Sequence, residues 1–206
     1  MNIEKAKNNI DSQLEKAMYA KAPVDNLHPI RVIQSLKSII GLNIDSPSEK
    51  LINWGSSYLK EIDSLPKDYF RYSIKKPKET IVLSEIGKYI LLNDNESCIR
   101  ELQDLCSVSD GNQIFEYLIE FSSTHNKSAL SLIWSAYRAS IFMKNKFSYQ
   151  LLLLSVKSLM NNCYVENGII SKIDNLSVVE SIRMTKLTRS SRINANLSGL
   201  QLDQSL

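Results

Sequence analysis

Apolar residues recur along most of this chain at intervals of three and four, the spacing that places side chains on one face of an α-helix. The first such stripe holds Ile3, Ala6, Ile10, Leu14 and Met18, which predicts a helix over residues 3–20. The same spacing predicts eight further helices, over residues 29–40, 47–65, 79–92, 96–108, 113–122, 127–144, 146–162 and 177–187.

Local sequence signals place several helix ends. Pro29 suits the first position of a helix, where its missing N–H is not needed, and Gly41 suits the end of the same helix. In Ser46-Pro47-Ser48-Glu49 we expect the first serine to cap the next helix, the proline to take its first position and the glutamate to complete a capping box. Gly55 lies on the apolar face of that helix and would let a neighbouring helix approach closely.

Two consecutive helices, predicted over residues 127–144 and 146–162, are apolar almost all round. The second contains the unbroken apolar run Leu151–Leu154. A helix that lacks a polar face is one that other helices cover on several sides. The sequence therefore predicts a central hairpin over residues 127–162 with other helices packed against both of its faces.

The chain has 206 residues, which favours one domain over two. We predict an all-α protein with a compact bundle of about seven to nine helices over residues 1–188, and a flexible C-terminal tail over residues 189–206. The short, uneven intervals between helix starts also resemble a short α-solenoid of helix pairs. We prefer the bundle because a solenoid needs a signature repeated at a fixed period, and the sequence contains none.

Composition narrows the class of protein. Hydrophobic residues make up 43% and charged residues 23% of the chain, which excludes a largely disordered chain, a collagen-like fibre and a disulfide scaffold. The three cysteines form no closely spaced pair, and Cys98 and Cys106 share one helical stripe, so we expect core thiols. Without an apolar leader segment, the expected compartment is the cytoplasm. No apolar run reaches the ~20 residues of a membrane span, so none is predicted.

The familiar catalytic and cofactor signatures are missing. The six glycines are dispersed singly, which excludes phosphate-cradling and dinucleotide-binding loops. The two histidines, His28 and His125, have no partner at metal-ligand spacing, and we expect a helix cap and a loop residue. The sequence therefore predicts neither a metal nor a cofactor, and it assigns no catalytic residue.

Arg138 is an unusual residue, because it lies inside the most apolar predicted helix, one turn after Trp134. A buried guanidinium needs an acidic partner, and Glu116 or Glu120 on the preceding helix is a candidate. A structural ion pair is the simpler interpretation. The functional one is a ligand or anion pocket formed near Trp134, Tyr137 and Arg138.

Two basic clusters suggest a phosphate-binding stripe, although the net charge is only +3. Aromatic residues among the cations of the first cluster suit single-stranded nucleic acid, through stacking and phosphate contacts. The first, at residues 67–78, holds Lys67, Arg71, Tyr72, Lys75, Lys76 and Lys78, and the second, at residues 183–192, holds Arg183, Lys186, Arg189 and Arg192.

The polar C-terminal segment carries spaced leucines that could dock on a partner or on a second copy of the chain, namely Leu197, Leu200, Leu202 and Leu206. From these observations we predict a non-catalytic helical protein-interaction or assembly module with a protein partner or a homo-oligomeric state. One alternative is a nucleic-acid-binding helical subunit that uses the two basic clusters. A second is a small helical enzyme or a lipophilic-ligand carrier with the pocket near Arg138.

Overall fold

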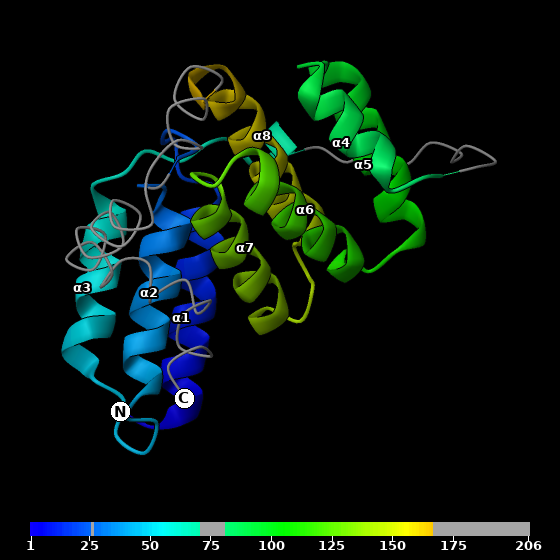
Figure 1. Cartoon of the computed structure of the whole chain (residues 1–206). Coiled ribbons are helices and arrows are strands. Elements are labelled where there is room, and N and C mark those ends of the chain that lie inside the picture. Colours follow the sequence, from blue (N-terminus) through cyan, green and yellow to red (C-terminus); the bar gives the residue numbers. More distant parts are fainter. Residues whose placement is uncertain (26, 71–80, 167–206) are drawn as a thin grey trace, which may run out of the picture.

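The computed structural model describes residues 1–25, 27–70 and 81–166 (Figure 1). Several sequence-based predictions concern residues outside these ranges. They are the helix over 177–187, the tail over 189–206, most of the first basic cluster and all of the second.

The described residues form eight α-helices and one short 3-10 helix, and they contain no β-strand. An all-α bundle of seven to nine helices is thereby confirmed. The helices are α1 (Ile3–Met18), α2 (Pro29–Gly41), α3 (Glu49–Lys60), the 3-10 helix η1 (Lys67–Phe70), α4 (Ser84–Leu91), α5 (Asn95–Val108), α6 (Asn112–His125), α7 (Leu130–Phe142) and α8 (Ser148–Glu166).

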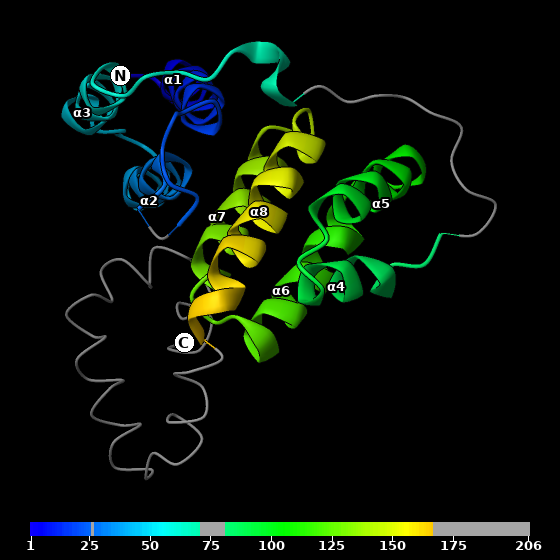
Figure 2. The same cartoon turned by 90° about the horizontal axis from the view of Figure 1, so that it is seen from above.

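The helices α7 and α8 form the central hairpin of the bundle. Figure 2 shows this pair in the middle, with α1, α2 and α3 on one side and α4, α5 and α6 on the other. The first group reaches the hairpin through the contact of α2 with α7, and the second packs on α8 through all three of its helices. Helices that are far apart in the sequence, such as α2 and α7, thus meet in space. In a solenoid, by contrast, each repeat packs only on its neighbours in the sequence.

Side-chain caps set the starts of α2 and α3, and the predicted start of α3 is wrong. His28 caps α2 with Pro29 at its first position, because the imidazole Nδ1 accepts a hydrogen bond from the N–H of Ile30 at 3.2 Å. The next helix begins at Glu49 and not at Pro47. Its cap is Ser48, whose hydroxyl accepts a bond from the N–H of Leu51 at 3.5 Å.

Gly55 allows the close packing of α3 that its sequence position suggested. A Cβ atom here would lie 2.5 Å from Leu36 Cδ2 and 2.7 Å from Gln13 Oε1. The buried Gln13 donates from Nε2 to the Ile52 carbonyl at 2.7 Å and to Ser56 Oγ at 2.8 Å. The absent side chain therefore leaves room for a hydrogen-bonded link between α1 and α3.

Asn126 fixes the turn between α6 and α7 against α8. Its side chain is fully buried, and its Nδ2 donates to the Leu159 carbonyl at 3.2 Å. Its Oδ1 accepts from Ser128 Oγ at 2.7 Å and from the N–H of Ala129 at 3.3 Å. A buried polar group is stable when its hydrogen bonds are made, so this amide defines the position of the hairpin.

Candidate binding site

An apolar groove with a volume of about 150 Å³ lies where α1, α2 and the end of α7 meet. Its charged lining residues are two lysines, Lys7 on α1 and Lys37 on α2. The main apolar side chains of the lining are Ile3, Ile10, Ile40, Ile44, Pro47 and Phe142.

Part of this apolar lining remains in contact with solvent. Ile3 is 49% exposed and Ile44 is 57% exposed, while Ile10 and Ile40 form the buried floor. Exposed apolar side chains beside a hollow are typical of interaction sites. They also leave surface that a ligand can bury, at about 25 cal/mol for each Å² removed from water.

Lys37 is the unusual residue of the groove, because its ammonium group is half-buried without an acidic partner among the described residues. The Nζ atom lies 4.7 Å from the ring centre of Phe142. Burial, together with the smaller effect of the positive charge of Arg138, lowers the pKa of Lys37 to about 8. The amine therefore remains protonated in most molecules at pH 7, although its partly buried position disfavours the charge.

Arg138 lies on α7 one turn before Phe142 and is half-buried. The expected ion pair with Glu116 or Glu120 is not formed. Glu116 instead acts electrostatically on Tyr137, and the pKa of that phenol is raised by burial and by the Glu116 charge. Arg138 acts electrostatically on Lys37, which is also a cation.

Two partly buried cations beside an apolar groove favour an anion. Removing a charge from water is costly unless an opposite charge and hydrogen bonds replace the lost hydration. A carboxylate near Lys37 would supply both and would relieve the repulsion between Lys37 and Arg138. The geometry therefore suits a ligand with an apolar body and an acidic group.

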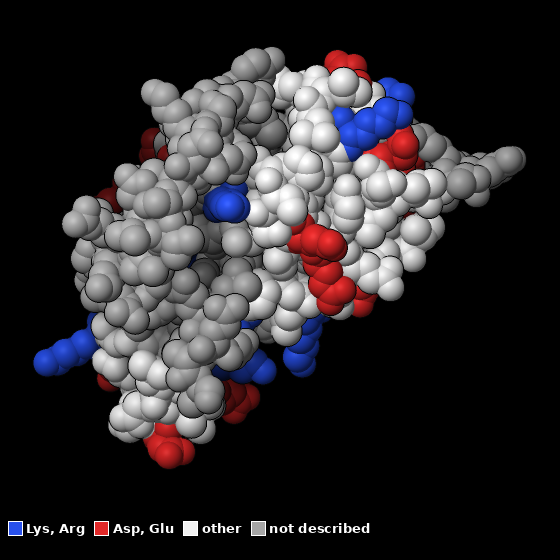
Figure 3. All heavy atoms as spheres, in the orientation of Figure 1, with Lys and Arg blue, Asp and Glu red and all other residues white. Residues whose placement is uncertain are grey.

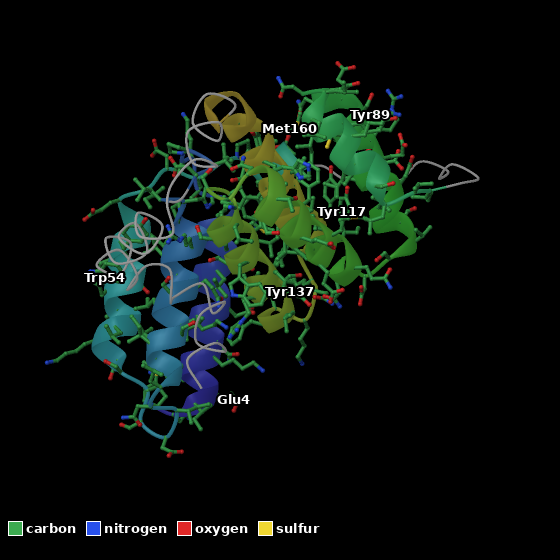
Figure 4. The ribbon with its side chains drawn as sticks, in the orientation of Figure 1. Glu4, Trp54, Tyr89, Tyr117, Tyr137 and Met160 are labelled. Atoms are coloured by element: carbon green, nitrogen blue, oxygen red, sulfur yellow. The ribbon has the colours of Figure 1, made fainter. Side chains whose placement is uncertain are left out.

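None of the three predicted pocket residues lines this groove, although Arg138 lies one turn before Phe142, which does. Trp134 and Tyr137 pack edge to face, with ring centres 5.9 Å apart. Tyr137 also contacts Phe115 of α6 at 5.3 Å, and Figure 4 shows Tyr137 where α7 faces α6. Tyr137 thus joins α7 to α6, and Trp134 packs on Tyr137 of its own helix.

The other predicted binding residues are placed only in part. Lys67 is exposed on η1, whereas Arg71, Tyr72, Lys75, Lys76 and Lys78 lie outside the described residues. All four basic residues of the second cluster lie outside them too, as do the four leucines of the tail. On the described part of the face in Figure 3, basic side chains lie apart from one another.

The contacts of His28, His125, Cys98 and Cys106 are those of residues that support the fold. His28 is the cap of α2, as expected, but His125 is the last residue of α6 and not a loop residue. Its ring stacks on Phe121 with centres 4.3 Å apart. Burial raises the pKa of both Cys98 and Cys106 to about 12, so neither thiol is a ready nucleophile at neutral pH.

The described residues contain no group of three or more His, Cys, Asp or Glu side chains that could hold a metal ion. Within the same residues, no helix has the length and apolar character needed to cross a membrane. Comparison of the chain with protein-family models, with curated proteins and with solved structures finds no match.

The sequence-based expectations did not include the groove, because they did not place Lys37 on the buried face of α2. Ile33, Leu36 and Ile40 are buried on that face, whereas Ile39 is 40% exposed. Lys37 lies one turn after Ile33 and one turn before Ile40, which is the signal that could have shown a lysine on the buried face.

Proposed function

We propose that this chain is a non-catalytic helical interaction module. Its groove between α1, α2 and α7 would receive an apolar segment of a protein partner that also carries an Asp or Glu side chain. The observation that supports this proposal is the pair of cations, Lys37 and Arg138, which lie beside an apolar groove with no acidic partner in the described part of the chain.

The size of the groove favours a protein segment over a lipophilic small molecule. Its volume is about 150 Å³, whereas sites that enclose a drug-sized ligand measure ~300–1,000 Å³. A volume of this size holds one or two apolar side chains, and the rest of the segment would lie along the exposed rim at Ile3 and Ile44. Helix-in-groove recognition uses anchors of this kind, spaced at three and four residues.

Selection from a displayed library of random peptides tests the proposal. We expect the selected peptides to share apolar residues at helical spacing and an acidic residue within one turn of them. Their affinity for two variants, measured by fluorescence anisotropy, should be lower. Ile44→Asp adds a negative charge to the rim, and Lys37→Met removes the buried cation, so each should weaken binding about tenfold.

The matched control is Leu42→Asp, because Leu42 is 82% exposed in the same loop but does not line the groove. This variant should bind the peptides as the wild type does. Selected peptides that lack acidic residues, or that bind Ile44→Asp unchanged, would contradict the proposal. So would a groove that takes no peptide but binds laurate, since that result would indicate a lipid carrier.

A further inference from the structure

A second pocket, of about 210 Å³, lies on a different part of the bundle, between the end of α1, the α1–α2 connection, η1 and α8. Its wall is held by backbone hydrogen bonds between two connecting segments. The N–H of Lys21 donates to the Asp63 carbonyl at 2.7 Å, and the N–H of Leu65 donates to the Tyr19 carbonyl at 2.6 Å. An isolated β-bridge joins Ala20 and Ser64 in the same place.

Lys157 of α8 brings a positive charge to this pocket. Its Nζ donates a hydrogen bond to the Tyr69 hydroxyl at 2.9 Å and lies 4.3 Å from the centre of the same ring. The described residues supply no acidic partner for this ammonium. Because the Tyr69 oxygen accepts from Lys157, the hydroxyl proton stays available as a donor, and two protons of the ammonium do so as well.

His28 provides a neutral donor to the same pocket. The side chain is 1% exposed, and its Nδ1 accepts the hydrogen bond that caps α2, so the ring proton lies on Nε2. No described residue forms a hydrogen bond with that Nε2–H. Burial lowers the pKa of His28 to about 4, although the nearby Asp25 opposes the shift, so the imidazole is neutral at pH 7.

The remaining lining is mainly apolar and includes Met18, Leu65, Phe70 and Leu154. Hydrogen-bond donors from Lys157, Tyr69 and His28 therefore line a pocket that is otherwise mainly apolar. We infer that this pocket binds a small monocarboxylate with a compact apolar body. This inference stands independently of the groove between α1, α2 and α7.

The charge balance favours a single negative charge on the ligand. Lys157 supplies one cation, and Lys21 adds a second at an exposed position of the lining. Asp25 acts electrostatically on His28, so an acidic group already lies close to the site. A phosphate dianion would meet this carboxylate with few cations to offset it, whereas a carboxylate needs one cation and the neutral donors.

Titration of the purified full chain with a matched pair of probes tests the inference. Phenylacetate and phenylacetamide have the same apolar ring, but only the acid carries a charge. Followed by ¹H–¹⁵N NMR, phenylacetate should shift the signals around Lys157, and phenylacetamide should bind at least about tenfold more weakly. Butyrate and 4-methylpentanoate extend the series to other apolar bodies.

Two variants separate this pocket from adventitious binding. Lys157→Met should weaken phenylacetate binding about tenfold, and Tyr69→Phe should weaken it less because only a neutral donor is lost. The control is Lys146→Met, whose ammonium lies 4.6 Å from the Phe147 ring in the same kind of contact but outside the pocket. Unchanged binding to Lys157→Met would overturn the inference, as would equal binding of acid and amide, tighter binding of inorganic phosphate, or no binding of any acid at millimolar concentration.

Discussion

Single residues in this protein show how burial and charge compete. An ammonium group that loses water usually regains stability from a carboxylate, but Lys37 contacts the face of Phe142 and has Arg138 as its charged neighbour. A cation over an aromatic ring gains ~0.5–2 kcal/mol, which offsets only part of the lost hydration. Lys37 thus lowers the stability of the unliganded fold at neutral pH.

Replacing Lys37 by methionine should stabilise the protein at pH 7, on the order of 1–2 kcal/mol. The pKa of Lys37 falls from 10.5 to about 8 on folding. Between these values the unfolded chain binds more protons, so wild-type stability rises with pH from about 8 to 10.5. The gain from Lys37→Met should therefore shrink across that range, as measured by urea unfolding at several pH values.

The control for this experiment is Lys60→Met, which removes an exposed lysine near the end of α3. It should change stability little, and by the same amount at each pH. A Lys37→Met variant that is no more stable than wild type at pH 7 would show that the ammonium group is well solvated in the folded state.

At the scale of elements, the sequence predicted the helices better than their ends. The hairpin of α7 and α8 could be predicted because a helix apolar on every side has few places in a bundle. The start of α3 could not, since Ser46 and Ser48 both have cap chemistry and only the path of the chain decides between them. The helix predicted over 79–92 begins at Ser84, and Val82, which lies inside the predicted range, is 45% exposed and precedes the helix.

Because α3 begins at Glu49, replacing Ser48 should affect the stability of the protein more than replacing Ser46. Ser48→Ala removes the hydroxyl that accepts from Leu51 N–H and should destabilise the protein by ~0.5–2 kcal/mol. Ser46→Ala changes an exposed residue outside the helix and should alter the unfolding free energy by less than ~0.5 kcal/mol. Thermal unfolding of the two variants in parallel distinguishes them, and equal losses would contradict this cap.

At the scale of the molecule, two groups of three helices share one hairpin as their common core. Arg138 could be singled out from the sequence because its charge interrupts an apolar helix. The groove itself could not, since it forms where residues as distant as Ile3, Pro47 and Phe142 meet. The pocket at Lys157 likewise depends on the contact of that side chain with Tyr69, 88 residues away. Both sites are products of tertiary packing.

The shared hairpin predicts that the two groups of helices unfold together. The chain has two tryptophans, Trp54 on α3 and Trp134 on α7, so each can be made the only one by replacing the other with phenylalanine. Trp54 lies at the outer edge of the first group (Figure 4). In each variant the fluorescence and circular dichroism midpoints in urea should coincide. An earlier midpoint for Trp54 would show that α1–α3 unfold separately.

The buried amide of Asn126 has a consequence for covalent modification. Asn126, Lys127 and Ser128 form an acceptor sequence for N-linked glycosylation. In the folded chain the Nδ2 atom that a sugar would join is fully buried and donates to the Leu159 carbonyl, while Ser128 bonds to the same amide. The folded protein therefore cannot be glycosylated at this asparagine, and a glycan added before folding would keep the turn between α6 and α7 from closing onto α8.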